Sequence, residues 1–398
     1  MSFDVAAVRR QFPALAAGAA HFDGPGGSQT PEVVARAVHD ALVSPIANRG
    51  FVTEAERNAE AVVEESRIAM ADLLGANPGG IVFGRSMTAL TFDFSRTLAA
   101  GWSAGDEVLV SRLDHDANVR PWVIAAERGG ATIRWIDFDP ESTELTVDHV
   151  REQLSERTRL VAVTGASNLI GTCPDIASIA AEVHAHEALL YVDGVHLTAH
   201  APVDVAALGA DFYVCSPYKF YGPHCGVLAA APALLEGLHP DKLLPSTNDV
   251  PERFELGTLP YELMSGTTAA VDFLASLGDG NTRRDRVFAA MDMAWKHEHE
   301  LRTRIEAAVC AMPDVTLHSR AGRRTPTLLF TFADASPAEV YARLAEVGVN
   351  APAGTFYAHE PARRLHLDDG GLRIGLAIYN DDNDVDRLLD GLKRALPG

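Results

Sequence analysis

Short β-rich runs alternate with helix-like segments from residue 81 onward, and this alternation constrains the fold more than any other feature of the chain. Such alternation predicts an α/β domain with a mostly parallel sheet. Because ligands bind at the carboxyl ends of the strands in such sheets, the residues that follow each strand are the first candidates for chemistry. The predicted strands are Ile81–Phe83, Glu107–Val110, Thr132–Ile136, Leu160–Val163, Leu189–Val192, Phe212–Cys215 and Val227–Ala230.

Five of these strands are followed by side chains of different chemistry. A hydroxyl, an imidazole, an amide, a carboxylate and an amine come in turn along the chain. One polar residue at a strand end is more often a cap or a turn residue than a catalytic group. Five of them at one edge of a sheet predict a ligand site. These residues are Thr88, His115, Asn168, Asp193 and Lys219.

The first of these strand ends is Gly84-Arg85-Ser86-Met87-Thr88, which opens a predicted helix. Hydroxyls and free N–H groups at a helix N-terminus bind anions. A plain helix cap is the simpler explanation when this segment is taken alone. We expect an anion site here because the other strand ends supply a ligand's remaining contacts.

Lys219 follows a strand and a Ser-Pro break, in the segment Ser216-Pro217-Tyr218-Lys219-Phe220. It is one of only four lysines in a chain that otherwise uses arginine. A lysine in apolar and aromatic company has a lowered pKa, which makes its amine a nucleophile. The alternative is a lysine at a strand end whose ammonium reaches water, and this stretch alone does not decide between them.

The composition excludes several classes of protein. The formal charge of -20 argues against nucleic-acid partners and anionic membrane surfaces. No apolar run approaches the roughly 20 residues of a membrane span, and Met1–Asp4 does not begin a signal peptide. The four cysteines show neither a paired framework nor metal-ligand spacing. We therefore expect a cytoplasmic protein without a metal or a membrane segment.

Two domains are expected at a length of 398 residues. The large domain, residues 20–265, would hold the sheet, and the smaller α+β domain, residues 266–398, would follow it. Residues 1–19, within an expected helix at 1–20, would pack near the small domain. Further predicted helices cover 31–44, 53–75, 285–311 and 383–396, and further predicted strands are Thr327–Phe332, Gly348–Ala351 and Leu372–Ala377.

A glycine-rich turn, Gly24-Pro25-Gly26-Gly27, precedes the first predicted helix of the large domain. Glycines allow the backbone to approach a ligand closely, although most such turns are only turns. The turn lacks the G-x-G-x-x-G spacing, so a dinucleotide fingerprint is rejected. We expect Gly26 and Gly27 to lie near the substrate.

Taken together, Asp193-Gly194-Val195-His196 and Ser216-Pro217-Tyr218-Lys219 with the following Gly222-Pro223 resemble a known family. The pattern is similar to that of class V aminotransferase-like enzymes, which use pyridoxal 5'-phosphate (PLP) and have fold type I. Within that family the chain looks most like the cysteine-desulfurase-like subgroup. The resemblance runs from Phe22 to about Asn380. It implies a large, mostly parallel-sheet domain and a smaller α+β C-terminal domain.

The resemblance implies three catalytic residues. Lys219 would hold PLP covalently and later move a proton. Asp193 would pair with the pyridine nitrogen, so that the ring can accept electrons. His115 would stack on the ring face.

It also implies the surrounding contacts. Met87, Thr88 and Ser216 would hold the phosphate. Arg373 would clamp the carboxylate of a small amino-acid substrate in bidentate fashion. These enzymes are homodimers with shared sites, so Thr258 would reach the phosphate of the partner subunit. The residues expected near the phenolic oxygen are His196 and Asn168, and Asn168 is a second candidate for the substrate carboxylate.

The chain departs from the desulfurases at three places. Their catalytic loop carries a cysteine that takes sulfur as a persulfide, but Val349–Ala358 contains none, and no cysteine follows Cys310. A loop arginine beside that cysteine is also absent. Tyr218 stands where desulfurases have histidine, so its cofactor contact would differ. Without a thiolate the usual persulfide chemistry has no agent.

The expected function is therefore a PLP-dependent reaction of an amino acid at Lys219, without persulfide formation. Lyase-type elimination of a C–S or other β bond is slightly favoured. Transamination is one alternative, and epimerisation is another because isopenicillin-epimerase-like proteins also resemble the chain. A non-catalytic PLP-fold binding protein is the rival from a different class. His200 and His224 are expected to be structural.

Overall fold

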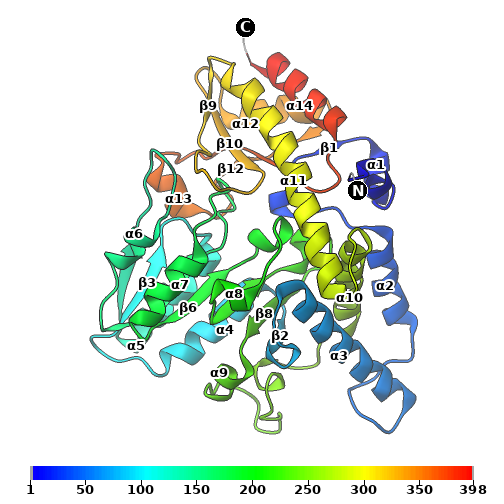
Figure 1. Cartoon of the computed structure of the whole chain (residues 1–398), viewed down its shortest axis with the longest axis vertical. Coiled ribbons are helices and arrows are strands. Elements are labelled where there is room, and N and C mark those ends of the chain that lie inside the picture. The colour runs from blue at the N-terminus through cyan, green and yellow to red at the C-terminus, as the bar shows by residue number, and fades with distance from the viewer. Residues whose placement is uncertain (1–2, 397–398) are drawn as a thin grey trace.

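A computed structural model describes residues 3–396, and its centre is a seven-stranded sheet of order β2-β8-β7-β6-β5-β3-β4 (Figure 1). The pairs from β4 through β3, β5 and β6 to β7 are parallel, and β8 runs antiparallel to both of its neighbours. This confirms the mostly parallel sheet and all seven of its strands. Their bounds are β2 (Ile81–Gly84), β3 (Glu107–Ser111), β4 (Thr132–Ile136), β5 (Thr158–Thr164), β6 (Leu189–Asp193), β7 (Phe212–Cys215) and β8 (Gly226–Ala230).

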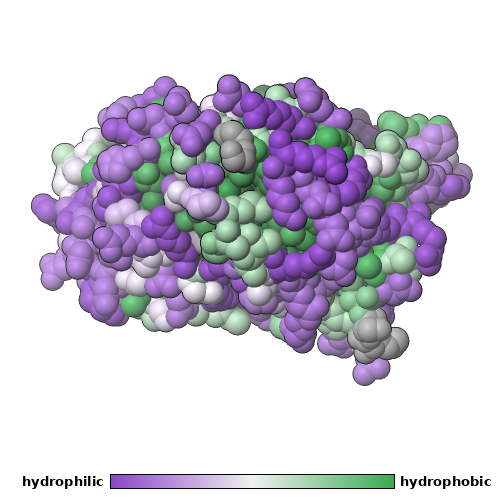
Figure 2. Space-filling model, turned by 90° about the horizontal axis from the view of Figure 1, so that it is seen from above, coloured by the Kyte–Doolittle hydropathy of each residue, from purple (hydrophilic) through white to green (hydrophobic). Residues whose placement is uncertain are grey.

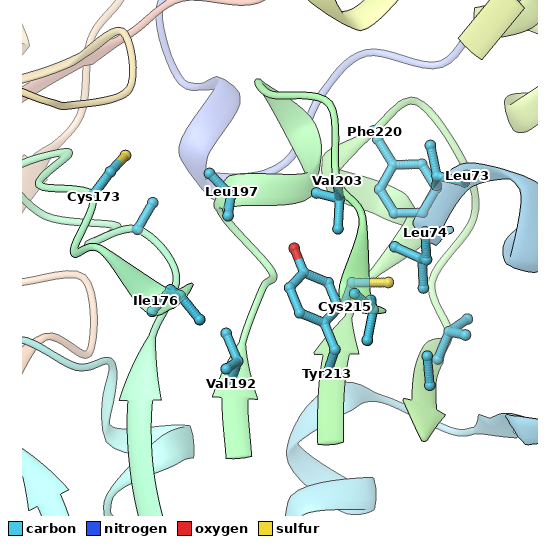
Figure 3. Packing of buried hydrophobic residues seen from close by; sticks show 14 of the residues in the cluster. Leu73, Leu74, Cys173, Ile176, Val192, Leu197, Val203, Tyr213, Cys215 and Phe220 are labelled. Carbon is cyan, nitrogen blue, oxygen red and sulfur yellow. The ribbon is translucent and has the colours of Figure 1, made fainter. Parts of the chain in front are cut away.

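Both faces of this sheet are covered, because successive side chains of a strand point to opposite sides. Along β7, Tyr213 and Cys215 join one buried cluster, while Phe212 and Val214 join the other. Figure 3 shows Tyr213 and Cys215 in the first cluster, beside side chains from helices and neighbouring strands. The helices of this part are α2 (Glu32–Val43), α3 (Glu54–Leu74), α4 (Met87–Ala99), α5 (Arg120–Gly129), α6 (Val147–Arg151), α7 (Ile176–Ala185), α8 (Val205–Leu208), α9 (Pro232–Glu236) and α10 (Tyr261–Ser276).

The C-terminal part is built on a four-stranded antiparallel sheet of order β12-β13-β10-β9. The predicted strand at 348–351 is shorter than expected. It is β11 (Val349–Asn350), which pairs in parallel with β1 (Ala20–His21) and does not join the larger sheet. The remaining elements are α11 (Arg283–Cys310), β9 (Val315–Leu317), β10 (Thr327–Phe332), α12 (Pro337–Glu346), β12 (Ala353–Gly354), α13 (His359–Arg364), β13 (Gly371–Gly375) and α14 (Asp382–Ala395).

The N-terminal segment differs from the single helix expected at 1–20. Within the described residues it consists of α1 (Val5–Arg9) and a 3₁₀ turn at Pro13–Ala17. Pro13 explains the interruption, because proline lacks the N–H that a continued helix requires. Arg9 donates to the carbonyl oxygen of Tyr379 and, at 2.7 Å, to Oδ2 of Asp384. The segment thus contacts the start of α14.

The division of the chain at residue 265 falls inside α10, which packs against α2 and α3. The domain boundaries therefore stay a prediction. None of the helices within residues 3–396 combines the length and the apolar character that a membrane span requires. The face seen in Figure 2 is largely hydrophilic, with smaller apolar areas between the charged side chains.

Candidate active site

A cavity of about 640 Å³ lies at the carboxyl ends of the central strands, where the two parts of the chain meet. It brings together residues from segments as far apart as Gly26 and Arg373. Eleven of the thirteen predicted site residues line it: Gly26, Met87, Thr88, His115, Asn168, Asp193, His196, Ser216, Tyr218, Lys219 and Arg373.

The other two predicted residues lie elsewhere. Gly27 is just outside the cavity, where a Cβ on it would lie 3.4 Å from the Tyr218 ring. Thr258 is exposed in the loop before α10 and does not line the cavity. Its expected role concerns a partner subunit and stays a prediction.

Lys219 ends a short 3₁₀ turn, Pro217–Lys219, that directs its side chain into the cavity. Its ammonium donates to the carbonyl oxygen of Pro25 and lies 4.8 Å from the centroid of the Tyr218 ring. Burial, followed by the positive charge of Arg373, lowers the pKa of Lys219 to about 7. A substantial fraction of the amine is therefore unprotonated near neutrality, as a nucleophile requires.

Asp193 is the last residue of β6 and is only 5% exposed. Burial raises its pKa to about 6, while a hydrogen bond from the Val195 amide at 2.9 Å and the charge of Lys219 oppose that rise. At neutral pH the side chain is thus mainly a carboxylate. It can pair with a cationic ring nitrogen.

His115 presents a neutral imidazole to the cavity. Its Nδ1 accepts the Ala117 amide at 3.0 Å, so the ring proton of the neutral form is on Nε2. Burial, then the charge of Lys219, lowers the pKa of His115 to about 4. A flat uncharged ring suits the predicted stacking on an aromatic cofactor.

His196 connects the cavity to the C-terminal part of the chain. Its Nε2 lies 3.0 Å from the hydroxyl of Thr325 and 2.9 Å from that of Thr327. Burial lowers its pKa well below the usual value, so the ring is neutral. Because the two threonines contact Nε2, only Nδ1 remains for the predicted contact with the phenolic oxygen of the cofactor.

Arg373, on β13, is a buried cation in the wall of the cavity. Its Nη1 donates to the carbonyl oxygen of Asn168 at 3.0 Å, and its Nε has no partner among the described residues. Burial lowers its pKa to about 9, which leaves it protonated at neutral pH. The side-chain Oδ1 of Asn168 is also buried without a described partner. Unpaired buried polar atoms in a cavity wall are available to a polar ligand.

The N-terminus of α4 lines one end of the cavity. Ser86 is the N-cap and accepts the Ala89 amide at 3.1 Å, while Met87 and Thr88 occupy the first turn. Gly226 of β8 lies directly against this turn, because a Cβ on it would be 2.3 Å from the Ser86 carbonyl carbon. The free N–H groups and the hydroxyls of Thr88 and Ser216 suit a phosphate.

Sequence reasoning missed Asp114, a fully buried carboxyl behind His115. Its oxygens accept hydrogen bonds from the Asn118 amide at 2.7 Å, the Thr164 N–H at 3.0 Å and the Ser111 hydroxyl. Burial raises its pKa to about 8. The available signal was its place three residues after β3, next to His115.

Sequence reasoning also gave no role to the aromatic pair Phe356 and Tyr357, which covers one side of the cavity. The pair belongs to Val349–Ala358, the stretch that contains no cysteine. No cysteine lines the cavity within residues 3–396. Burial raises the pKa of three of the thiols, and the fourth is exposed at the end of α11: Cys173, Cys215, Cys225 and Cys310.

This set of groups fits PLP. The N-terminus of α4 and nearby hydroxyls suit its phosphate, and the carboxylate of Asp193 suits its pyridine nitrogen. The amine of Lys219 suits its aldehyde. The unpaired atoms of Arg373 and Asn168 remain for a further polar ligand.

Comparisons with known proteins agree with this geometry. The family model described as aminotransferase class-V matches residues 20–388. The aminotransferase-like protein FGM3 of Gibberella zeae is 32% identical over 99% of both chains, and a cysteine desulfurase of Klebsiella pneumoniae is 32% identical over 99% of this chain and 98% of that protein. The crystal structure of the cysteine desulfurase CsdA of Escherichia coli superposes with a TM-score of 0.88 at 28% identity, covering 99% of each chain. The chain therefore belongs to the class V aminotransferase family and is a PLP-dependent enzyme.

Proposed function

We propose that this enzyme acts on a small amino acid and eliminates a substituent from its Cβ, without forming a protein persulfide. One observation carries the proposal: a lysine amine, a buried carboxylate and a buried arginine share a cavity that no cysteine lines within the described residues. The arginine suits the carboxylate of an amino acid, and the lysine suits the removal of its Cα proton. The missing thiol argues against sulfur transfer to the enzyme.

Each of the three residues has a distinct task. Arg373 binds and orients the substrate carboxylate with the free edge of its guanidinium. Lys219, in its unprotonated form, accepts the proton from Cα. Asp193 stabilises a positive charge on the cofactor ring. PLP, when bound, supplies the electron sink for the pair left at Cα.

The overall reaction balances with water alone. The Cα–H bond breaks, and its proton goes to the amine of Lys219. The electron pair left at Cα then forms the Cα–Cβ double bond as the bond from Cβ to the leaving group breaks. The leaving group keeps the electron pair of that broken bond and takes a proton. Hydrolysis of the resulting unsaturated amine gives a 2-oxo acid and ammonium.

Transamination is the second candidate, supported by the 32% identity to a relative named as aminotransferase-like. The same three residues would serve transamination, in which Lys219 would deliver the proton to the cofactor and not back to Cα. Epimerisation would return the proton to the other face of Cα. A non-catalytic binding protein would leave every amino acid unchanged.

Product analysis on a panel of amino acids separates these candidates. Elimination yields ammonium and a 2-oxo acid without a second substrate, while transamination requires an oxo-acid acceptor. Epimerisation exchanges the Cα proton with solvent deuterium and consumes nothing. Absence of any spectral change in the bound cofactor with every amino acid would contradict the proposal.

We also propose that the enzyme is a homodimer with shared active sites and works in the cytoplasm. Exposed apolar side chains gather in two loops and at the helix end beside the first: Leu42 and Val43 end α2, Phe51 and Val52 lie in the loop that follows it, and Leu243, Leu244 and Leu256 lie in the second loop. An ion pair of 3.0 Å between Arg49 and Glu252 links the loops. A second copy of the chain is the occupant we favour, since the exposed Thr258 lies beside the second loop. The free cysteines suit a reducing compartment.

A further inference from the structure

The loop that covers the active-site cavity has an unusual backbone. Phe356 and Tyr357 follow one another in the left-handed region, with φ values of 54° and 57°. This conformation is unfavourable for bulky side chains and persists only where neighbouring groups hold it. Two such contacts are present: the Asn168 amide donates to the carbonyl oxygen of Phe356 at 3.0 Å, and the Asp116 N–H donates to that of Tyr357 at 2.8 Å.

The strained backbone places the Phe356 ring over Arg373. The guanidinium carbon of Arg373 lies 3.6 Å from the centroid of that ring. A cation over an aromatic face is attracted to it, more strongly when both groups are removed from water. Arg373 is only 2% exposed and Phe356 is half-buried, so the cation is shielded from water and the ring is partly shielded.

Few other groups fix the orientation of Arg373. Its Nε has no partner within residues 3–396, and its one side-chain hydrogen bond runs from Nη1 to the Asn168 carbonyl. The only carboxylate charge that stabilises its cation is that of Asp23, which makes no hydrogen bond to it among the described residues. The nearest constraint on the Nη2 side is Gly26, whose Cβ, if present, would lie 3.6 Å from Nη2. The aromatic face therefore restrains the plane of the guanidinium together with the Asn168 carbonyl and the charge of Asp23.

Asn168 connects the two partners. Its backbone carbonyl accepts from Arg373, while its side-chain amide donates to the carbonyl of Phe356. The arginine, the aromatic ring and the asparagine thus form a closed set of contacts. Displacement of any one of them changes the direction of the guanidinium edge.

We propose that Phe356 is a positioning residue: its ring holds the guanidinium of Arg373 so that one edge faces the cavity and takes the carboxylate of the amino-acid substrate. The inference deepens the proposed function and rests on it for the identity of the substrate. It also assigns a role to the loop that lacks the desulfurase cysteine.

The test compares Phe356→Leu with Phe356→Tyr in the PLP-loaded enzyme. Leucine keeps an apolar side chain but removes the aromatic face, while tyrosine keeps that face at the same strained position. The dissociation constants of alanine and ethylamine are measured from the spectral change of the cofactor. Alanine carries the carboxylate and ethylamine does not.

Phe356→Leu is expected to weaken alanine binding about tenfold, the effect of losing one desolvated cation–π contact, and to leave ethylamine binding within about twofold. Phe356→Tyr restores alanine binding to within about twofold of the wild type. Arg373→Lys is expected to weaken alanine binding as well, and the double variant with Phe356→Leu should be no weaker than Arg373→Lys alone, because the two residues act as one unit.

Three results would overturn the inference. Wild-type affinity for alanine in Phe356→Leu contradicts it and leaves the proposed function intact. An equal loss of alanine and ethylamine binding indicates a merely structural role for the ring. A wild-type enzyme that responds to neither compound refutes the proposed function and this inference with it. Circular dichroism and thermal melting confirm that each variant is folded.

Discussion

The Lys219 amine lies where burial and the positive charge of Arg373 both favour its neutral form. Only the neutral amine attacks an aldehyde, so the residue is inactive while protonated. Its lowered pKa places the change near neutrality, far below the 10.5 of a free lysine. The pH dependence of cofactor capture therefore reports the environment of one side chain.

We predict that protein freed of cofactor captures PLP at a rate that rises with pH through about 7 and is constant at higher pH. Below that pH the ammonium form dominates and capture slows. Rapid-mixing absorbance measurements at a series of pH values test this. Arg373→Gln is expected to move the midpoint upward, because it removes a positive charge that lowers the pKa of Lys219. A wild-type midpoint near 10 would contradict the buried position of the amine.

The sequence predicted some residues of the site and missed others. Asp193 and Lys219 were predicted because each follows a buried strand of a parallel sheet, where ligands bind. Phe356 was not, since no glycine marks its left-handed backbone. The hydrogen bond from Arg373 to Asn168 could not be predicted either, because its acceptor is a backbone carbonyl, which every residue type has.

At the scale of elements, the active site depends on the close approach of β8 to the start of α4. A side chain at Gly226 would lie 2.3 Å from a Ser86 backbone carbon and 2.4 Å from the Met87 nitrogen. Backbone atoms cannot give way as a flexible side chain would. The strand and the helix would have to separate, and the N–H groups of α4 would move with the helix.

We predict that Gly226→Ala lowers PLP affinity at least about tenfold and lowers the free energy of unfolding by about 1–3 kcal/mol, the usual cost of overpacking. Fluorescence titration with PLP and urea denaturation measure the two effects. Gly237→Ala is the matched control, because its nearest neighbour would be an oxygen at 3.5 Å. Equal behaviour of the two variants would show that the approach of β8 to α4 is not critical.

The regular elements were largely predictable, and the short ones were not. Strands of four or more residues with apolar side chains on both faces, such as β5 and β7, are distinct from the helices around them. β9 and β12 have three and two residues, too few to show a period. The residues of β11 were predicted to form a strand. Their partner strand β1 lies more than 300 residues away in the sequence, so the pairing itself could not be predicted.

At the scale of the whole molecule, the C-terminal part completes a site that begins in the large sheet. Arg373, Phe356 and the threonines that hold His196 all come from beyond residue 320. The resemblance to a family predicted Arg373, but periodicity alone could not bring it to Lys219. Chain folding over such distances is specified by packing of the entire core.

The two exposed apolar loops lead to a prediction for assembly. Leu244 is 100% exposed and Phe51 is 76% exposed in the single chain. We expect a dimer in sedimentation analysis, and we expect Leu244→Glu to raise its dissociation constant at least about tenfold by placing a charge in an apolar interface. Tyr341→Glu is the control. Tyr341 is an exposed apolar residue on α12 of the C-terminal part, outside these loops. A monomeric wild-type enzyme with full activity would refute the proposed dimer.

The most direct test of the proposed chemistry is the product formed from β-substituted amino acids, cysteine and β-chloroalanine included. The enzyme is expected to release pyruvate and ammonium in equal amounts, with no alanine from cysteine, no persulfide on the protein and no activity in Lys219→Ala. Alanine formed from cysteine in step with a persulfide on Cys173, Cys215, Cys225 or Cys310 would contradict the account.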